Sequence, residues 1–464
     1  MVRTDIDRGS DASRGRISQR LWIASLVVLP YASYVGLLML LSLFIAALVR
    51  RGGRVMRLCA RRGFGWLAAG MLLSACFAMD RGEGFLILTN FLPFFVMFGV
   101  MATVPVVVDR PFEALERLAS WLLISSIPMT VGAIAEFIIK FESIEPAAKA
   151  SSLPSWLLDH IFEEDFGHRA HSVFSHPNML SAYLAILLGL GLGLVLKALN
   201  TKTLNTKTLD DRTLNTKTLN TKTLSKKRNN AKTWAQGVAL LLCLVAIFCT
   251  GSRNGLLIAG VLLAIALYAA RRYRWVLLSG LAVGGFLVSA MFAFGIGGRS
   301  LSLALVTQDP RLGVWRLAIE MIQQRPLLGW GFSSLRQLYI PGSIPDYDVI
   351  YHAHNFWLYM ASEAGIPVMV GFCLVIGTIY YDGVKAYLDR AAWQKQMILL
   401  TPEGRVSTGD RSILLGYLLA FASVILFALF DVAVFDSRVN LFNWGLVAAI
   451  YALSREVLAS KQEA

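Results

Sequence analysis

Residues 178–199, NMLSAYLAILLGLGLGLVLKAL, form an apolar run with one charged residue, long enough to cross the hydrocarbon core of a bilayer as a single helix. The GLGLG stretch at 189–193 indicates close packing of this helix against a neighbour. Other runs of spanning length are 65–79, 85–107, 118–140, 234–250, 254–270, 275–298, 355–380, 412–430 and 436–454. Charged residues make up 16% of the chain, against about a quarter in soluble domains. The sequence therefore predicts an all-α polytopic membrane protein.

The first apolar run, Leu21–Val49, decides the orientation of the chain. Pro30 and the polar residues after it predict two short helices joined by a tight turn. The chain then returns to the cytoplasmic side before the six arginines of residues 50–62, as the positive-inside rule requires. This choice gives about 12 transmembrane helices with both termini cytoplasmic. It places 200–233 and 381–411 in the cytoplasm and two long loops, 141–177 and 299–353, on the periplasmic face of a bacterial inner membrane.

Residues 200–224 are a five-residue repeat, NTKTL, with one altered unit. Because this stretch is basic and has little apolar surface, we expect a disordered cytoplasmic linker that carries topological charge. The expected organisation is N-terminal transmembrane helices (1–199), linker (200–233), transmembrane helices (234–298), large periplasmic loop (299–353) and C-terminal transmembrane helices (354–464).

Histidine and arginine gather on the predicted periplasmic face. All six histidines fall in the two long loops, and they are His160, His168, His171, His176, His352 and His354. The same face holds Arg169, Arg253, Arg299, Arg311, Arg316, Arg325 and Arg336. Guanidinium groups bind phosphate oxygens bidentately and keep their charge, so such a cluster suits a lipid-linked phosphate or diphosphate. Simple snorkelling of each arginine at the interface is the alternative.

Two of these arginines lie in strings with local structure. Arg253 occupies a short turn between two apolar spans, which pins its charge at the membrane boundary. In residues 309–335 the positions Leu312, Trp315, Ile319 and Ile322 recur at helical spacing, which predicts an amphipathic helix that carries Arg311 and lies on the membrane or acts as a structural lid.

In YHAHNFWLYMASEAG, residues 351–365, two histidines directly precede an apolar run. An extended segment puts the rings of His352 and His354 on one side, and Asn355 is expected near the N-cap of the next helix. The positive end of that helix favours the neutral imidazole of His354, which can then accept a proton. Two other interpretations stay open: a structural histidine pair, and a divalent ion held with Asp346 and Asp348. We predict no metal, because no helix-spaced second pair supports one.

The strings HRAHSVFSHPN, TGSRNG, RLGVWRLAIEMIQQRPLLGWG and HAHNFWLYMASEAGIP resemble, in this order and on one face, the O-antigen ligase and polymerase superfamily of bacterial inner-membrane glycosyltransferases. The resemblance is densest from about 235 to 375. The family pattern of His-Asn, nine residues and Gly fits His354, Asn355 and Gly365, and Val368 stands where the pattern has a second glycine.

The resemblance implies transfer of a glycan from undecaprenyl diphosphate to a sugar hydroxyl of lipid A-core in the periplasm, without metal or nucleotide. In this scheme His354 is the general base and His352 orients it or the acceptor. The diphosphate is bound by Arg169, Arg253 and Arg311, with Asn355, His176 and Arg316 as supporting residues. A direct role of Glu363, about three helical turns deeper, is not expected.

The resemblance leaves other functions open. An O-antigen polymerase would use a second lipid-linked glycan as the acceptor. A transporter or flippase of an anionic lipid would place charges near the bilayer midplane and contain inverted repeats, and the sequence indicates neither. The expected partners are the lipid-linked glycan, lipid A-core and membrane lipids, without nucleic acid.

Overall fold

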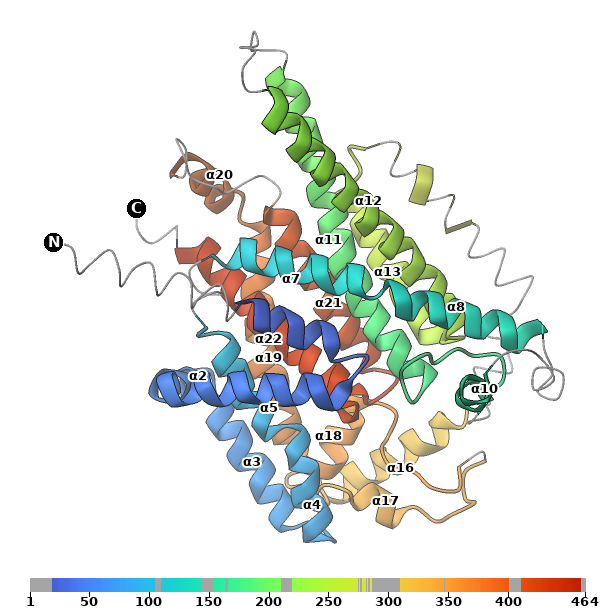
Figure 1. The fold of residues 1–464 in the computed structure, drawn as a ribbon. Coiled ribbons are helices and arrows are strands. Elements are labelled where there is room, and N and C mark those ends of the chain that lie inside the picture. The colour runs from blue at the N-terminus through green and yellow to red at the C-terminus, as the bar shows by residue number, and fades with distance from the viewer. Residues whose placement is uncertain are drawn as a thin grey trace.

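The computed structural model describes residues 19–104, 110–142, 154–162, 166–209, 219–273, 309–345, 347–399 and 410–459, with a few residues between 275 and 285. Within these ranges every regular element is a helix (Figure 1), which confirms the all-α class. The first described helix is Gln19–Val28. In chain order the main helices that follow are α2 (Ser33–Arg61), α3 (Phe64–Cys76), α4 (Arg81–Ile87), η1 (Leu88–Asn90), α5 (Leu92–Met101), α7 (Pro111–Ser125), α8 (Ile127–Glu142), α10 (Ser155–Phe162), α11 (Pro177–Leu209), α12 (Leu219–Cys249), α13 (Arg253–Ala269), α16 (Arg311–Gln324), α17 (Ser334–Leu338), α18 (Phe356–Ala364), α19 (Ile366–Leu388), α20 (Arg390–Leu399), α21 (Asp410–Phe427), η3 (Ala433–Phe435) and α22 (Ser437–Ala459).

Seven helices of the described chain are long and apolar enough to cross a membrane, so this is a multi-pass membrane protein. They are Ser33–Arg61, Arg81–Met101, Pro111–Phe141, Pro177–Thr201, Asn230–Cys249, Ile366–Leu388 and Asp410–Phe427. Three shorter apolar helices are Gln19–Val28, Phe64–Cys76 and Arg253–Ala269. The predicted run at 275–298 falls largely outside the described residues.

The first apolar run is broken as predicted. One helix ends at Val28 and the next begins at Ser33, because Pro30 lies between them. The second helix, however, continues through the arginines to Arg61 and ends before Gly63, which has a φ of 88°. Residues 50–61 are therefore helical, although the sequence suggested a basic loop.

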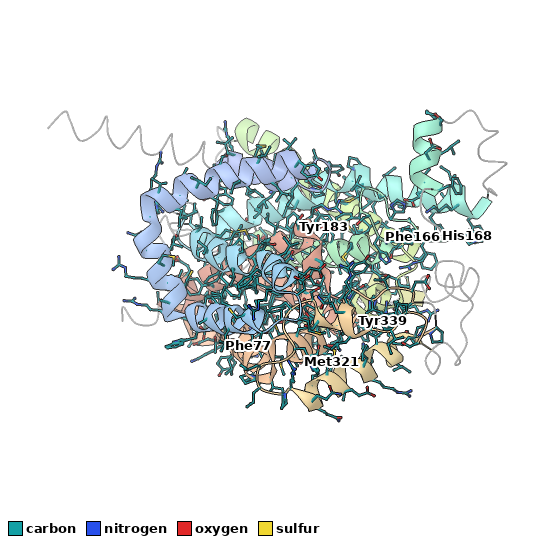
Figure 2. All side chains as sticks on the ribbon, turned by 90° about the horizontal axis from the view of Figure 1, so that it is seen from below. Phe77, Phe166, His168, Tyr183, Met321 and Tyr339 are labelled. Atoms are coloured by element: carbon teal, nitrogen blue, oxygen red, sulfur yellow. The ribbon has the colours of Figure 1, made fainter. Side chains whose placement is uncertain are left out.

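The helix over residues 178–199 lies at the centre of the molecule. It forms the N-terminal two thirds of α11, and 89% of its most apolar 18-residue stretch is buried. Its glycines pack against α21 as predicted, since a Cβ on Gly193 would stand 2.5 Å from the Cα of Gly416. Tyr183, one turn into this run, is fully buried and lies near the middle of the bundle in Figure 2. Close backbone contact thus fixes α11 against α21.

The predicted span at 355–380 is two helices rather than one. α18 ends at Ala364, and Gly365 follows with a φ of 88°, a backbone conformation that favours glycine. A Cβ on Gly365 would also collide with the carbonyl oxygen of Leu327. Pro367, in the first turn of α19, suits the start of a new helix. The break makes α18 a short helix of its own next to the 325–335 segment.

The predicted disordered linker is helical over the described part of the repeat. α11 continues to Leu209 and α12 begins at Leu219, so helices extend beyond the apolar runs at both sides of the insert. Residues 210–218 lie outside the described residues. The threonine-rich repeat therefore continues two long neighbouring helices, which Figure 1 shows side by side.

Different polar groups gather at the two ends of the bundle. α16 and α17 lie at the lower end in Figure 1, whereas α20 lies at the upper end. Near the upper end, Nζ of Lys197 lies 3.0 Å from Glu116 Oε2 and 2.8 Å from Asp410 Oδ1. The elements at the lower end include α16, which begins with Arg311.

Candidate functional site

The segment that carries the expected base lies directly before α18. Asn355 is the N-cap of this helix, and its Oδ1 accepts hydrogen bonds of 3.0 Å from the backbone N–H groups of Trp357 and Leu358. This confirms the predicted cap. His354 has a left-handed backbone with a φ of 48°. The rings of His352 and His354 meet edge to face with centroids 4.5 Å apart, so the two imidazoles form one cluster, as expected.

The start of α18 is tied to the residues directly after α21. The backbone N–H of Phe356 and Nδ2 of Asn355 donate hydrogen bonds of 2.8 and 3.0 Å to carbonyl oxygens there. These bonds bring Asp431 beside His354, with 3.5 Å between Oδ1 and Nδ1. That separation is longer than an ordinary hydrogen bond, and catalytic pairs commonly shorten when substrate binds.

Asp431 is a buried carboxylate among cationic and polar groups. Burial alone would raise the pKa of Asp431, but the adjacent His354 and His352 and the charge of Arg311 hold this pKa below its ordinary value. Its second oxygen, Oδ2, accepts a 3.0 Å hydrogen bond from Nδ2 of Asn178. Asp431 is therefore ionised at neutral pH, and it can fix the orientation of the His354 ring.

Asn178 connects this carboxylate to Arg169. Nη2 of Arg169 donates a 2.7 Å hydrogen bond to Asn178 Oδ1, and its Nε donates a 2.9 Å bond to the carbonyl of Thr250. Only 8% of Arg169 is exposed. A continuous polar chain thus runs from Arg169 through Asn178 and Asp431 to His354.

The turn that carries Arg169 is held by a buried ion pair on α8. Glu136 Oε1 lies 2.9 Å from Nζ of Lys140, and the carboxylate also accepts hydrogen bonds from the backbone N–H groups of His171 and Ser172. Lys140 donates a second bond of 3.1 Å to the carbonyl of Arg169. Lys140 therefore fixes the backbone before residue 170, and Glu136 fixes the backbone after it.

Arg253 begins α13 close to the same turn. Ser252 is the N-cap of α13, and its Oγ accepts a 3.3 Å hydrogen bond from the N–H of Gly255. The carbonyl that binds Arg169 belongs to Thr250, three residues before Arg253. The chain therefore brings the backbone segments of these two arginines together, as the sequence suggested.

Arg311 begins α16, and its N–H donates a 3.0 Å hydrogen bond to Oδ1 of Asp309. Its charge is close enough to act on Asp431 and on His352, so Arg311 belongs to the cluster. Arg316, five residues further along α16, has an exposed side chain. It forms no hydrogen bond or ion pair with the described residues of the cluster.

The amphipathic helix exists as predicted, and the side that packs on protein is not its predicted apolar face. The residues of α16 that are buried are Val314, Ala318 and Met321, whereas 43% of Ile319, a member of the predicted face, is exposed. α16 packs against α18. A periodic pattern alone did not indicate which face packs on protein.

Two histidines of the cluster are neutral at physiological pH. Burial, followed by the charge of Arg169, lowers the pKa of His176 to about 4. Burial, followed by the neighbouring His354, lowers the pKa of His352 to about 4. Nδ1 of His176 accepts a 3.0 Å hydrogen bond from the N–H of Asn178, so His176 also supports the start of α11.

The remaining described histidines are structural. Nδ1 of His168 lies 2.7 Å from the carbonyl of Lys140, and Nδ1 of His171 lies 2.8 Å from that of Phe174. Figure 2 places Phe166 and His168 together near the edge of the molecule. The side chain of His160 lies outside the described part of the structure.

The other outer-face arginines bind elsewhere or cannot be placed. Arg336 pairs with Glu83 at 3.3 Å, and Arg325 lies over the ring of Trp330 at 3.9 Å. Arg299 falls outside the described residues. The expected arginine cluster is thus smaller than the full set in the sequence.

Arg438 is a supporting residue that the sequence analysis did not select. It binds Asp436 through Nη2 at 2.7 Å and Nε at 3.1 Å, and its Nη1 donates to the carbonyl of Val173 at 2.8 Å. Asp436 also accepts from the first N–H groups of α22. Asp436 and Arg438 are therefore paired at the start of α22, and Arg438 attaches this helix to the turn before α11.

Glu363 binds backbone groups at the start of α17. Its carboxylate accepts hydrogen bonds of 2.5 and 2.9 Å from the N–H groups of Ser333 and Leu335. Burial raises the pKa of Glu363 to about 8. This residue holds the segment before α17 against the end of α18.

His352, His354 and Asp431 could together hold a metal ion, because each offers one ligand atom and these atoms lie within 4.8 Å of one another. This set differs from the one in the sequence pattern. Asp348 has an exposed side chain, and Asp346 lies outside the described residues. Any metal would therefore occupy the position of the expected base rather than a separate site.

Residues 238–373 match the family model described as O-antigen ligase. This match supports membership of the O-antigen ligase superfamily. A comparison with curated proteins gives no match. The O-antigen ligase match contains Arg253, Arg311, His352, His354 and Asn355, while Arg169 and Asp431 lie outside it. The family consists of O-antigen ligases and polymerases. The match therefore supports a glycosyltransferase-like role in O-antigen processing and lipopolysaccharide biosynthesis, and it implies lipid-linked glycan substrates.

Proposed function

We propose that this protein is an O-antigen ligase. It transfers O-antigen polysaccharide from undecaprenyl diphosphate to lipid A-core oligosaccharide, at the periplasmic face of the bacterial inner membrane. The observation that carries the proposal is the polar chain from Arg169 through Asn178 and Asp431 to His354, because it joins a phosphate-binding group to a base within one cluster.

In the proposed reaction His354 acts as the general base. With Asp431 beside Nδ1, the tautomer that carries its proton on Nδ1 is favoured, so Nε2 accepts the proton of the acceptor hydroxyl. The acceptor oxygen forms a bond to the anomeric carbon while the bond from that carbon to the diphosphate oxygen breaks. A single displacement inverts the anomeric centre. Undecaprenyl diphosphate leaves and carries the electron pair of the broken bond.

The arginines stabilise the leaving group. Negative charge grows on the diphosphate as the glycosidic bond breaks, and preorganised guanidinium groups lower the energy of that transition state. We assign this role to Arg169, Arg253 and Arg311. Because the diphosphate is a good leaving group, the reaction needs no nucleotide and no cofactor. His352 and Asn355 keep the base in place, and His176 and Arg316 remain candidate supporting residues.

Transfer in vitro tests the function. Purified protein is incubated in detergent and EDTA with an undecaprenyl-diphosphate glycan and lipid A-core, and wild type is compared with His354→Ala. We expect a glycan ladder on lipid A-core from wild type, and a loss of about 10²–10⁴-fold in rate in the variant. Chain growth between two lipid-linked glycans would identify a polymerase instead. No product with either acceptor would favour a transporter, and activity only after divalent metal is restored would assign the cluster to a metal.

A further inference from the structure

A pocket lies beside Asp431, between α18, α19, α21 and α22, with about 650 Å³ of space that is partly open to the surroundings. Its cavity volume is about 80 Å³, several times the roughly 10–15 Å³ that one water molecule needs. Its wall is mostly apolar, and its aromatic residues are Phe91, Phe356, Trp357, Phe372, Phe421 and Trp444. Such a wall suits a hydrocarbon chain.

Two buried amides in this wall have unused hydrogen-bonding capacity. Asn440 is fully buried and Asn443 is 6% exposed, and Oδ1 of each has no hydrogen-bond partner among the described residues. The Nδ2 group of Asn440 is occupied by a 2.8 Å bond to the carbonyl of Asn90. Both residues lie one turn apart on α22 and line the pocket. A buried acceptor without a hydrogen bond costs free energy, and a ligand that donates hydrogen bonds to these two oxygens would remove this cost.

The chemistry of the wall selects among lipids. None of the residues that line the pocket is lysine or arginine, so it is unsuited to a phosphate group. A polyisoprenoid chain carries no N–H or O–H along its length, and it would leave both asparagine oxygens unpaired. An amide-linked or hydroxylated acyl chain has donors a few bonds from its sugar head, and it would satisfy them while its tail fills the aromatic part.

The position of the pocket relates it to the acceptor. Asp431 forms part of its wall and also lies beside His354. Arg169 lies in the turn before α11 and Arg311 begins α16, and neither that turn nor these two helices contribute to the wall. A lipid in this pocket therefore approaches the base from the side that lacks the arginines.

We propose that the pocket binds an N–H- or O–H-bearing acyl chain of the lipid acceptor, with Asn440 and Asn443 as its hydrogen-bond acceptors. The identity of the occupant rests on the proposed function, in which an acylated amino-sugar lipid is the acceptor. The two asparagines are thus specificity-determining residues that distinguish the acceptor lipid from the isoprenoid donor.

Binding without turnover tests this inference. Full-length protein in phosphatidylcholine nanodiscs is titrated with lipid A that lacks core sugars, or with undecaprenyl phosphate, and no donor glycan is added. For Asn443→Leu we expect the Kd of lipid A to rise about 10-fold, the loss of roughly one hydrogen bond, with an unchanged Kd for undecaprenyl phosphate. Asn443→Leu leaves the Asn440–Asn90 bond intact, which protects the fold.

A second variant fills the pocket without changing its polar groups. Val447→Phe adds bulk to the wall, and it should weaken lipid A binding by a similar factor. If only the binding of undecaprenyl phosphate were weakened, the pocket would be the isoprenoid site. If both variants bound both lipids as wild type does, the pocket would bind neither lipid and would hold only water. Either result overturns the proposal. Because no step of glycan transfer enters these titrations, their outcome is independent of whether wild type proves to be a ligase.

Discussion

Asp431 lies 3.5 Å from Nδ1 of His354 and accepts a 3.0 Å hydrogen bond from Asn178 on its other oxygen. The carboxylate therefore connects the base side of the cluster with the arginine side. In this arrangement Asp431 is a positioning residue, since it acts on the acceptor through the imidazole. It also connects the end of α21 with the start of α18. The turn after α21 therefore contributes both to helix packing and to the position of the proposed base.

Asp431→Asn should reduce kcat about 100-fold, with a small change in the KM values of both substrates. The amide keeps the size of the side chain but no longer stabilises the imidazolium that forms when His354 takes a proton. Steady-state kinetics in the transfer assay measure this. Asp382→Asn is the matched control, because Asp382 forms a 3.3 Å ion pair with Arg62 away from the site. Equal rates for Asp431→Asn and wild type would remove Asp431 from the mechanism.

Substitution of a diphosphate-binding arginine should weaken donor binding more than substitution of an arginine outside the cluster. Arg253→Glu should abolish transfer by placing a negative charge where the diphosphate binds. Arg325→Gln is the control, because this guanidinium lies over Trp330, and it should keep near-normal transfer. Donor KM and kcat, measured on folded protein, separate the two. Near-normal activity of well-folded Arg253→Glu would contradict the assignment.

Features that depend on neighbouring residues could be predicted from the sequence. Asn355 was recognisable as an N-cap because capping involves only the next two or three residues. The break after Pro30 has the same local origin. The GLGLG stretch predicted a close helix contact correctly, although its partner, Gly416 on α21, could not be named.

Features that depend on distant segments were missed. Asp431 follows an apolar span and resembles an ordinary turn residue, and only the bonds from residues 355 and 356 to the end of α21 place it beside His354. A carboxylate in a short turn on the predicted periplasmic face was the available signal. The side of α16 that packs on protein could not be named from the sequence, because Leu, Ile and Trp gave the stronger periodic pattern, while the contact with protein uses Val314, Ala318 and Met321.

Acidification should destabilise the protein through His176. Its pKa falls from about 6.5 in the unfolded chain to about 4 in the fold, because it is buried. The unfolded chain therefore binds more protons between these values, so the free energy of unfolding decreases as the pH falls from about 6.5 to 4. His176→Gln should recover about 1–2 kcal/mol of the loss between pH 7 and pH 5.

Thermal unfolding at pH 7 and pH 5 measures this effect. Phe166→Leu serves as the control, since the ring of Phe166 contacts His176 with centroids 5.0 Å apart but does not titrate. We expect this variant to lower Tm equally at both pH values and to keep the wild-type pH dependence. An identical pH dependence in His176→Gln and wild type would show that His176 does not cause the acid sensitivity.

Glu136 should affect transfer only through Arg169. Its carboxylate binds the N–H groups of His171 and Ser172 and pairs with Lys140, which in turn binds the carbonyl of Arg169. Glu136→Gln keeps the shape but removes the ion pair, so we expect a rise of about 10-fold in donor KM, equivalent to roughly 1.4 kcal/mol.

A double-mutant cycle separates this role from general stability. In an Arg169→Ala background, Glu136→Gln should cost almost nothing further, because residues that act through one another are not additive. A contribution to overall stability alone would instead give the same loss in both backgrounds. Lys197→Met is the matched control, since it removes a buried pair at the opposite end of the bundle and should combine additively with Arg169→Ala. Additive behaviour of Glu136→Gln would place Glu136 among the residues that stabilise the fold without positioning Arg169.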